Sequence, residues 1–234
     1  MARFRVVLVR PENAANIGAC ARLVRNVAAE GLDLVAPGDW RTVECWRTAW
    51  GAQDVLEEAR VFPDLAPALE GVALAVGLTG RRDARAASVD VREAAAEIAS
   101  LGSEAAAALV FGPETSGLSV AELACCGRRA RIPSHPAQPS FNLSHAVAIA
   151  LYEVRRALTH CPTAGPRRAS HDEKERLLAL LREGLLALGA LPAHNTEGYF
   201  RDWRALVQRT DVSPRELKLL EHVARKMARA GERQ

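Results

Sequence analysis

The sequence predicts an α/β protein: an open parallel sheet flanked by helices, followed by a small all-helical extension. Strand-like and helix-like stretches alternate over about the first 150 residues, which favours parallel β-α-β units. The strand-like runs are continuously apolar, as expected when helices cover both faces of a sheet. A Pro- and Gly-containing segment at 159–170 then interrupts all periodicity and indicates a linker. The predicted units are 1–158, the linker 159–170, and an extension over 171–234.

Five apolar runs are the predicted strands: 4–9, 31–37, 72–78, 107–112 and 130–132. Between them, one helix is expected from Ile17 to about Ala28, and another from an N-cap at Asp90 to Gly102. The helix predicted over 142–158 is amphipathic. Its apolar stripe consists of Leu143, Val147, Ala150, Leu151 and Val154.

The extension contains three predicted helices. The first covers about 171–188, with a stripe of Leu177, Leu181, Leu185 and Leu188, and the second covers about 196–209, with Phe200, Trp203, Leu206 and Val207. The third begins at Ser213, where Pro214 and Glu216 complete a capping box. Its predicted stripe is Leu217, Leu220, Val223 and Met227.

Composition excludes several classes of protein. Five cysteines without a C-x-x-C pair argue against a disulfide framework or a zinc knuckle, so we expect no metal. No apolar run approaches the 18 residues of a membrane span, and the N-terminus lacks a signal peptide, which together predict a cytoplasmic protein. Residues 1–154 hold 15 Lys and Arg against 18 Asp and Glu, whereas 155–234 hold 16 against 10. A basic tail is typical of nucleic-acid partners, although a solvated helical surface would look the same.

Polar and glycine-rich segments follow the predicted strands, where ligands bind in open α/β sheets. No G-x-G-x-x-G follows the first strand, the Gly112 loop lacks the lysine of a P-loop, and no G-x-S-x-G elbow occurs. Serine and histidine cluster around 134–145, but no acidic residue there could orient an imidazole, so nucleophilic serine chemistry is disfavoured. A dinucleotide-dependent oxidoreductase is opposed by the same missing glycines.

Individually, the polar residues of these loops are ambiguous. Asn16 and Asn142 could be N-caps or ligands. Gly18, inside a helix, indicates close approach by a ligand or another backbone. Arg22 could be a surface ion-pair partner, whereas Glu114, in a Gly- and Pro-containing loop, favours a specific hydrogen-bonding role.

Three motifs in order are more specific than any one residue: NIGACAR after the first strand, GPETSGL after a later one, and IPSHPAQPSFNLSHAVAI at the last long helix of the α/β unit. Together they resemble the SpoU branch of the SPOUT methyltransferases over residues 1 to about 158. The leucine spacing and charge of the extension look like those of the TrmJ group, whose members methylate a ribose in the tRNA anticodon loop. The cofactor loop departs from that group at Leu78, and Phe141 stands where Leu is usual.

The resemblance implies a parallel sheet whose C-terminal part forms a trefoil knot, a homodimer, and S-adenosyl-L-methionine as cofactor. By motif match, the cofactor-binding residues would be Leu78, Thr79, Gly80, Gly112, Ile132, Ser140, Phe141 and Leu143. The implied catalytic residues are Arg22, Asn16, Glu114, Ser140 and Asn142. A guanidinium stays protonated, so we expect Arg22 to fix the target phosphate and polarise the ribose hydroxyl rather than act as a base.

The implied reaction is 2'-O-methylation of a ribose in RNA, with anticodon-loop nucleotide 32 of tRNA (C or U) as the expected target. The expected backbone contacts to RNA are Arg22, Arg167, Arg168, Arg201, Arg204 and Arg209. Two alternatives stay open at this point: the same chemistry on ribosomal RNA, and an RNA-binding protein of the same fold with a degenerate pocket.

Overall fold

A computed structural model describes residues 2–80, 87–160, 168–191 and 195–231. Within these ranges the strands form one seven-stranded sheet of order β3-β2-β1-β6-β4-β7-β5, and every strand pairing is parallel. The predicted α/β class is therefore confirmed. The strands are β1 (Arg3–Val9), β2 (Leu32–Val35), β3 (Arg60–Phe62), β4 (Val72–Leu78), β5 (Val89–Asp90), β6 (Ala106–Phe111) and β7 (Arg128–Arg131).

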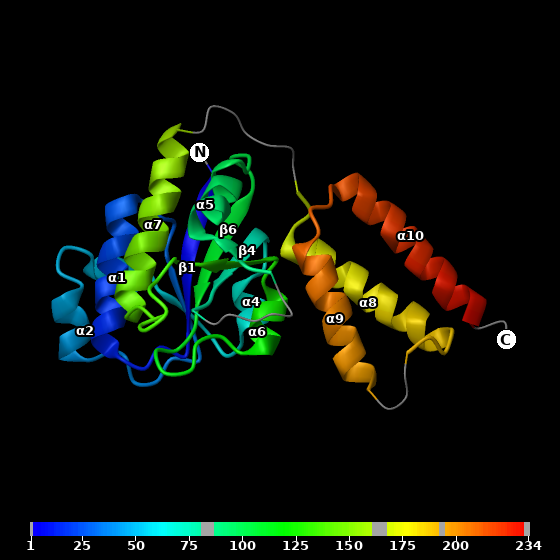
Figure 1. Cartoon of the computed structure of the whole chain (residues 1–234), viewed down its shortest axis with the longest axis horizontal. Coiled ribbons are helices and arrows are strands. Elements are labelled where there is room, and N and C mark those ends of the chain that lie inside the picture. The colour runs from blue at the N-terminus through cyan, green and yellow to red at the C-terminus, as the bar shows by residue number, and fades with distance from the viewer. Residues whose placement is uncertain (1, 81–86, 161–167, 192–194, 232–234) are drawn as a thin grey trace.

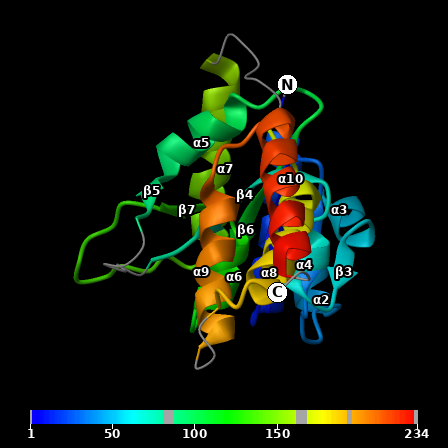
Figure 2. The same cartoon turned by 90° about the vertical axis from the view of Figure 1, so that its right-hand side faces the viewer.

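The helices of the α/β part alternate with these strands, and three further helices follow. They are α1 (Ala14–Val27), α2 (Val43–Thr48), α3 (Gln53–Glu57), α4 (Leu65–Ala68), α5 (Val91–Ala99), α6 (Val120–Cys125), α7 (Leu143–His160), α8 (His171–Ala187), α9 (Thr196–Arg209) and α10 (Pro214–Gly231). Helices α1, α5 and α7 cover one face of the sheet, α4 and α6 lie on the other, and α8–α10 stand beyond α6 (Figures 1 and 2).

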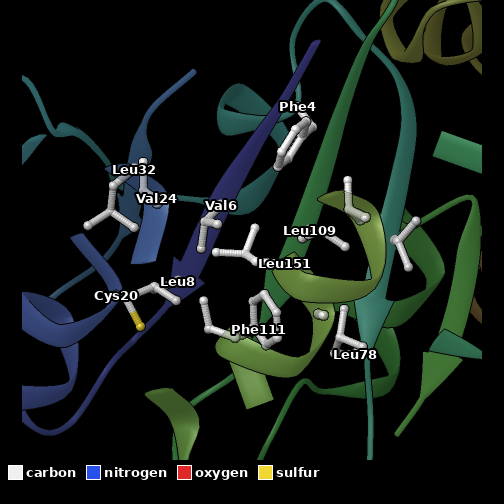
Figure 3. Close-up of a cluster of buried hydrophobic side chains, with 14 of the residues drawn as sticks. Phe4, Val6, Leu8, Cys20, Val24, Leu32, Leu78, Leu109, Phe111 and Leu151 are labelled. Carbon is white, nitrogen blue, oxygen red and sulfur yellow. The ribbon is translucent and has the colours of Figure 1, made fainter. Parts of the chain in front are cut away.

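The alternation of side chains along β1 explains why both faces need cover. Phe4, Val6 and Leu8 point into the core beneath α1 and α7, where Figure 3 shows them with Leu109 and Leu151. Val7 and Val9 point into the second core, beneath α4 and α6. Successive residues of a strand face opposite sides. The second half of the strand, Val6–Val9, is therefore apolar and buried on both faces, as its sequence predicted.

Helix α1 begins earlier than the sequence analysis expected. Asn13 is its N-cap and accepts a hydrogen bond from the Ala15 amide at 2.8 Å, so the helix starts at Ala14 rather than Ile17 and Asn16 is not the cap. The cap releases Asn16 to point into the fold, where it is 8% exposed. The predicted cap at Asp90 is confirmed, although α5 ends at Ala99, before Gly102.

The strands β3 and β5 and the helices α2, α3, α4 and α6 were missed. They have at most six residues each, too few for hydrophobic periodicity to identify. Helix α2 accounts for Gly18: a Cβ there would lie 2.1 Å from the Cys45 carbonyl oxygen. The expected close approach at Gly18 is therefore made by another backbone.

The helical extension has a small core of its own and is attached to the α/β part. Its buried residues are Ala169, Leu177, Leu178, Phe200, Val207, Val212 and Leu217. The buried Lys174 ammonium donates to the Gln208 carbonyl oxygen at 2.9 Å, and that oxygen lies against Gly127, where a Cβ would be 2.5 Å away. Asp172 accepts from the Gly71 amide at 3.0 Å, so α8 is also tied to the loop before β4.

The predicted apolar stripes are wrong in part in all three helices of the extension. Leu220 and Val223 of α10 are 44% and 54% exposed, Leu206 of α9 is 41% exposed, and Leu188 is 38% exposed. Three helices bury only a narrow stripe each, so apolar spacing overestimated the packed surface.

The middle of the predicted linker, 161–167, lies outside the described residues. Residues 81–86 also lie outside the described ranges, and the expected trefoil knot stays a prediction. No helix of the described chain is long and apolar enough to cross a membrane.

Candidate functional site

Glu114, in the second sequence motif, contacts the first motif and the residues just before it at the carboxyl edge of the sheet. Its carboxylate accepts from the backbone amides of Glu12 and Asn13 at 2.9 and 3.3 Å, and from the Asn16 side-chain amide at 2.7 Å. A carboxylate satisfied by three donors is fixed in place. The specific hydrogen-bonding role expected for Glu114 is thus present in the structure.

Asn142 extends this network from a third segment of the chain. Its Nδ2 donates to Asn16 Oδ1 at 3.2 Å, across 126 residues of sequence. Its Oδ1 accepts from the Ser144 amide at 3.0 Å at the start of α7. Asn142 therefore caps the start of α7, one of the two roles that the sequence left open, and it also joins Asn16 and Glu114. We call Asn16, Glu114 and Asn142 the polar network.

Arg22 lies on α1 but outside the polar network. It is exposed and makes no hydrogen bond or ion pair within the described part of the chain. It comes six residues after Asn16, or roughly 9 Å along the helix axis. Within a single chain, neither Asn16 nor Glu114 therefore forms a hydrogen bond or ion pair with Arg22.

A cavity of about 710 Å³ opens beside the polar network. Its volume lies within the roughly 300–1,000 Å³ typical of small-molecule sites. All eight residues expected to bind the cofactor line it: Leu78, Thr79, Gly80, Gly112, Ile132, Ser140, Phe141 and Leu143. Glu114 lines it as well, whereas Asn16, Arg22 and Asn142 do not.

The wall of the cavity is built by close backbone approach. A Cβ at Gly112 would lie 2.2 Å from the Leu118 amide nitrogen, and one at Gly80 would lie 3.2 Å from the Pro139 carbonyl oxygen. The turn from Gly112 to Leu118 contains Gly117, whose φ of +63° lies in the left-handed region that glycine adopts readily. Only glycine allows the segments after β4, β6 and β7 to converge this closely.

Sequence reasoning missed several lining residues. Thr115 and Ser116 belong to the GPETSGL motif and were passed over. Arg131 directly precedes Ile132 and is the one cation among the described lining residues. Its Nε is buried without a hydrogen-bond partner. Its position next to a motif residue was the only signal in the sequence.

Other ionisable side chains nearby do not suggest nucleophilic or metal chemistry. Burial raises the pKa of the Cys20 thiol, and the charge of Glu114 adds to this, so Cys20 is a neutral core residue. Burial likewise raises the pKa of Cys45. No group of three His, Cys, Asp or Glu side chains in the described ranges could hold a metal ion.

The arginines expected to contact RNA fall into two sets. Arg168 pairs with Asp211 at 3.1 Å, and Arg204 pairs with Glu175 at 3.1 Å. Arg201 and Arg209 are exposed. Arg167 lies outside the described residues. The first pair is therefore engaged in holding the extension together, and the second pair is open to solvent.

A family model described as the SpoU rRNA Methylase family matches residues 3–152. The chain belongs to the SpoU rRNA methylase family. The match covers the sheet, the cavity and the polar network, and it confirms the family inferred from the three ordered motifs. The helices that this SpoU protein carries after α7 lie beyond the match.

Known relatives extend the similarity across these helices. The SpoU chain is 34% identical to "tRNA (cytidine/uridine/adenosine-2'-O-)-methyltransferase TrmJ" of Pseudomonas aeruginosa (strain UCBPP-PA14), over 93% of this chain and 91% of the relative. A crystal structure of TrmJ from Z. mobilis ZM4 superposes with a TM-score of 0.84 at 29% identity, over 97% of this chain and 99% of that one. An AdoMet-bound rRNA methyltransferase from Sinorhizobium meliloti superposes at 0.53 with 27% identity, over 69% of this chain and 57% of that one.

Proposed function

We propose that this protein transfers a methyl group from S-adenosyl-L-methionine to the 2'-hydroxyl of a ribose in tRNA, at anticodon-loop nucleotide 32 carrying C or U. The observation that carries the proposal is that the second and third motifs line one cavity, and that Asn16 of the first motif joins both of them through the polar network at its edge. The substrate class is supported by the TrmJ relatives, which match both the α/β part and the extension.

The residues of the cavity fit the cofactor. Leu78, Ile132 and Leu143 supply apolar wall for an adenine ring, and the tight approach at Gly112 leaves backbone groups open to a ribose. When bound, S-adenosyl-L-methionine supplies an electrophilic methyl group on its sulfonium. Ser140 is exposed at the cavity and is available for polar contacts with the methionine part or the target phosphate.

The chain's own task is to orient and polarise the ribose hydroxyl. Glu114 fixes the Asn16 amide, and Asn142 fixes it from the other side, so the edge of the cavity presents a preorganised set of dipoles. Arg22 fixes the phosphate of the target nucleotide and polarises its hydroxyl, and the proton leaves to phosphate or water. A protonated guanidinium donates in a planar fork, which suits phosphate recognition.

Arg22 also supports a homodimer. Because it is exposed, has no partner in the described chain and lies well along α1 from the polar network, it is free to complete the site of a second copy. In the extension, Arg201 and Arg209 would contact the RNA backbone, with Arg167 as a further contact. Together with Arg22 these are the basic residues we assign to RNA. Arg168 and Arg204, which were also expected to contact RNA, are instead engaged by Asp211 and Glu175 within the extension. We place the protein in the cytoplasm, with its substrate.

The deciding experiment maps ribose methylation in total RNA from a strain lacking the protein. We expect loss of one 2'-O-methyl group, at nucleotide 32 of tRNAs with C or U there, and recovery when the gene is restored. Loss at another tRNA position would overturn the assigned nucleotide, and loss at a ribosomal RNA site would overturn tRNA as substrate. An unchanged methylation map would refute the enzymatic proposal.

A paired experiment in vitro tests Arg22. The purified chain is given unmodified tRNA transcript and labelled cofactor, and Arg22→Lys is expected to lower turnover about 100-fold because an ammonium cannot replace a two-pronged donor. Cofactor affinity, measured by calorimetry, should stay unchanged since Arg22 does not line the cavity. Equal turnover of Arg22→Lys and the wild type would show that Arg22 is only a surface cation.

A further inference from the structure

Three of the four tryptophans lie within eleven residues, at positions 40, 46 and 50. Arginines directly follow two of them, Arg41 and Arg47, so the segment holds three aromatic and two basic side chains. None of these residues belongs to the polar network or lines the cavity. The segment contains α2 and the turns on either side of it.

The tryptophans differ in their surroundings. Trp40 is 6% exposed and lies beneath the Arg41 guanidinium, whose carbon is 5.1 Å from the ring centre. Trp46 is half-buried and packs against the core under α1. Trp50 is 73% exposed. A large aromatic ring directed at solvent is the exception that calls for an explanation.

The exposure of Trp50 does not come from a loosely held turn. Its neighbours Ala49 and Ala52 are fully buried. Gly51 adopts a φ of +75°, in the left-handed region that reverses the chain after the ring. The Thr48 hydroxyl lies 3.0 Å from the Ala15 carbonyl oxygen, which fixes the end of α2 to α1. The ring is thus held outward by a turn that is itself packed.

The turn stands beside the catalytic edge of the sheet. Thr48 contacts Ala15, and Ala15 directly precedes Asn16 of the polar network. Figure 1 shows α2 next to the beginning of α1, at the level where β1 ends. Arg47 adds an exposed cation, its side chain 76% accessible and its nearest carboxylate, Glu44, 4.0 Å away.

We propose that Trp50 is a stacking platform for an unpaired base next to the methylated ribose, with Arg47 beside the RNA backbone. The inference rests on the proposed function, because it takes RNA as the substrate. Bases splayed from RNA loops stack on aromatic rings, and the gain is largely independent of their identity. Because the backbone of the turn is already packed, the ring makes such a contact without the cost of ordering the turn on binding.

The test compares Trp50→Phe, Trp50→Leu and Trp50→Ala, using the full-length protein and unmodified tRNA transcript. Binding is measured by fluorescence anisotropy of labelled RNA. We expect Trp50→Ala and Trp50→Leu to weaken binding about tenfold, and Trp50→Phe to remain within about threefold of wild type, because Phe keeps a π-face. Affinity for S-adenosyl-L-methionine and the melting temperature should not change. Val61→Ala, which trims another exposed apolar side chain, serves as the control.

Each other outcome counts against stacking. Equal RNA affinity in all variants would refute the platform. Loss in Trp50→Phe equal to that in Trp50→Ala would refute a π contact, and a change of oligomeric state, read by light scattering, would assign Trp50 to a contact between copies. A wild-type chain that methylates no RNA would refute the proposed function itself. Normal wild-type methylation together with an unaffected Trp50→Ala would refute the stacking inference alone.

Discussion

The α/β part and the helical extension differ in how completely they bury the apolar side chains of their helices. The α/β part buries apolar side chains on both faces of a sheet, and the stripe of α7 is buried throughout: Leu151 is 0% exposed (Figure 3). In the extension, α10 buries Leu217 and Ala224 but leaves Leu219 64% exposed. Amphipathic spacing of similar quality therefore produced a closed core in one region and a half-open one in the other.

The two regions also use polar groups differently. In the α/β part, the polar network joins three segments distant in sequence at the edge of the cavity, and so serves the site. In the extension, the most buried charged group is Lys174, which contacts Gln208 at the attachment to the α/β part. The polar network thus forms part of the candidate site in the α/β part, whereas the buried Lys174 attaches the extension to the α/β part.

The comparison predicts its largest effect in the α/β core. Leu151→Ala should lower the free energy of unfolding by about 3 kcal/mol, because it removes a fully buried side chain and leaves a cavity that α7 cannot close. The measurement is urea unfolding followed by circular dichroism. A loss below about 1 kcal/mol would mean that α7 is less tightly packed than its burial indicates.

The buried Lys174, at the attachment of the extension, should make the free energy of unfolding depend on pH. Burial lowers the pKa of Lys174 to about 8, so the unfolded chain binds this proton more tightly than the folded one. The folded state is therefore penalised at neutral pH, and stability should rise by about 2–3 kcal/mol between pH 7 and pH 10 from this group. Lys174→Met should remove that rise in urea unfolding measured across the range. The exposed Lys218→Met is the matched control, and an identical slope in both variants would contradict the assignment.

The contact between α1 and α2 supplies a smaller effect. Gly18→Ala places a methyl group 2.1 Å from the Cys45 carbonyl oxygen, so the helices must separate, at a cost of about 2 kcal/mol. Since Thr48 lies at this contact and donates to Ala15, the residue before Asn16, methyl transfer should fall as well. Gly31→Ala, where a Cβ would meet nothing within 4 Å, is the control for thermal unfolding. Equal melting temperatures for the two variants would be inconsistent with the tight approach.

The smallest effect is expected on the exposed side of the extension. Leu219→Ala should change the free energy of unfolding by less than about 0.5 kcal/mol, because the side chain is already mostly in solvent. The same urea series used for Leu151→Ala measures it. A loss near that of Leu151→Ala would show that α10 is covered in solution, and the difference between the two regions would disappear.

Much of the fold could be predicted because its longer elements carry their own signal. The strand at 72–78 matches β4 residue for residue, since a continuous apolar run of that length between turn residues has few other readings. The capping box at Ser213 and Glu216 is present, with the Glu216 amide donating to the Ser213 hydroxyl at 3.3 Å. The short helix α2 has no such signal, and the exposed face of α10 could not be recognised from spacing alone.

The sequence by itself determined the order of the longer strands and helices, the family, and eight of the residues that line the cavity, because local propensity and ordered motifs encode all three. Only the tertiary structure decided which partners those residues have. Asn16 and Asn142 are hydrogen-bonded across 126 residues, and Gly18 packs against α2, a helix that no sequence pattern predicted. The same holds for Arg22, whose solitary position on α1 depends on how neighbouring elements pack around it. Such contacts form when the whole sheet packs between its helices. The two residues of each contact lie far apart in the chain, so no local stretch of sequence can encode the pair.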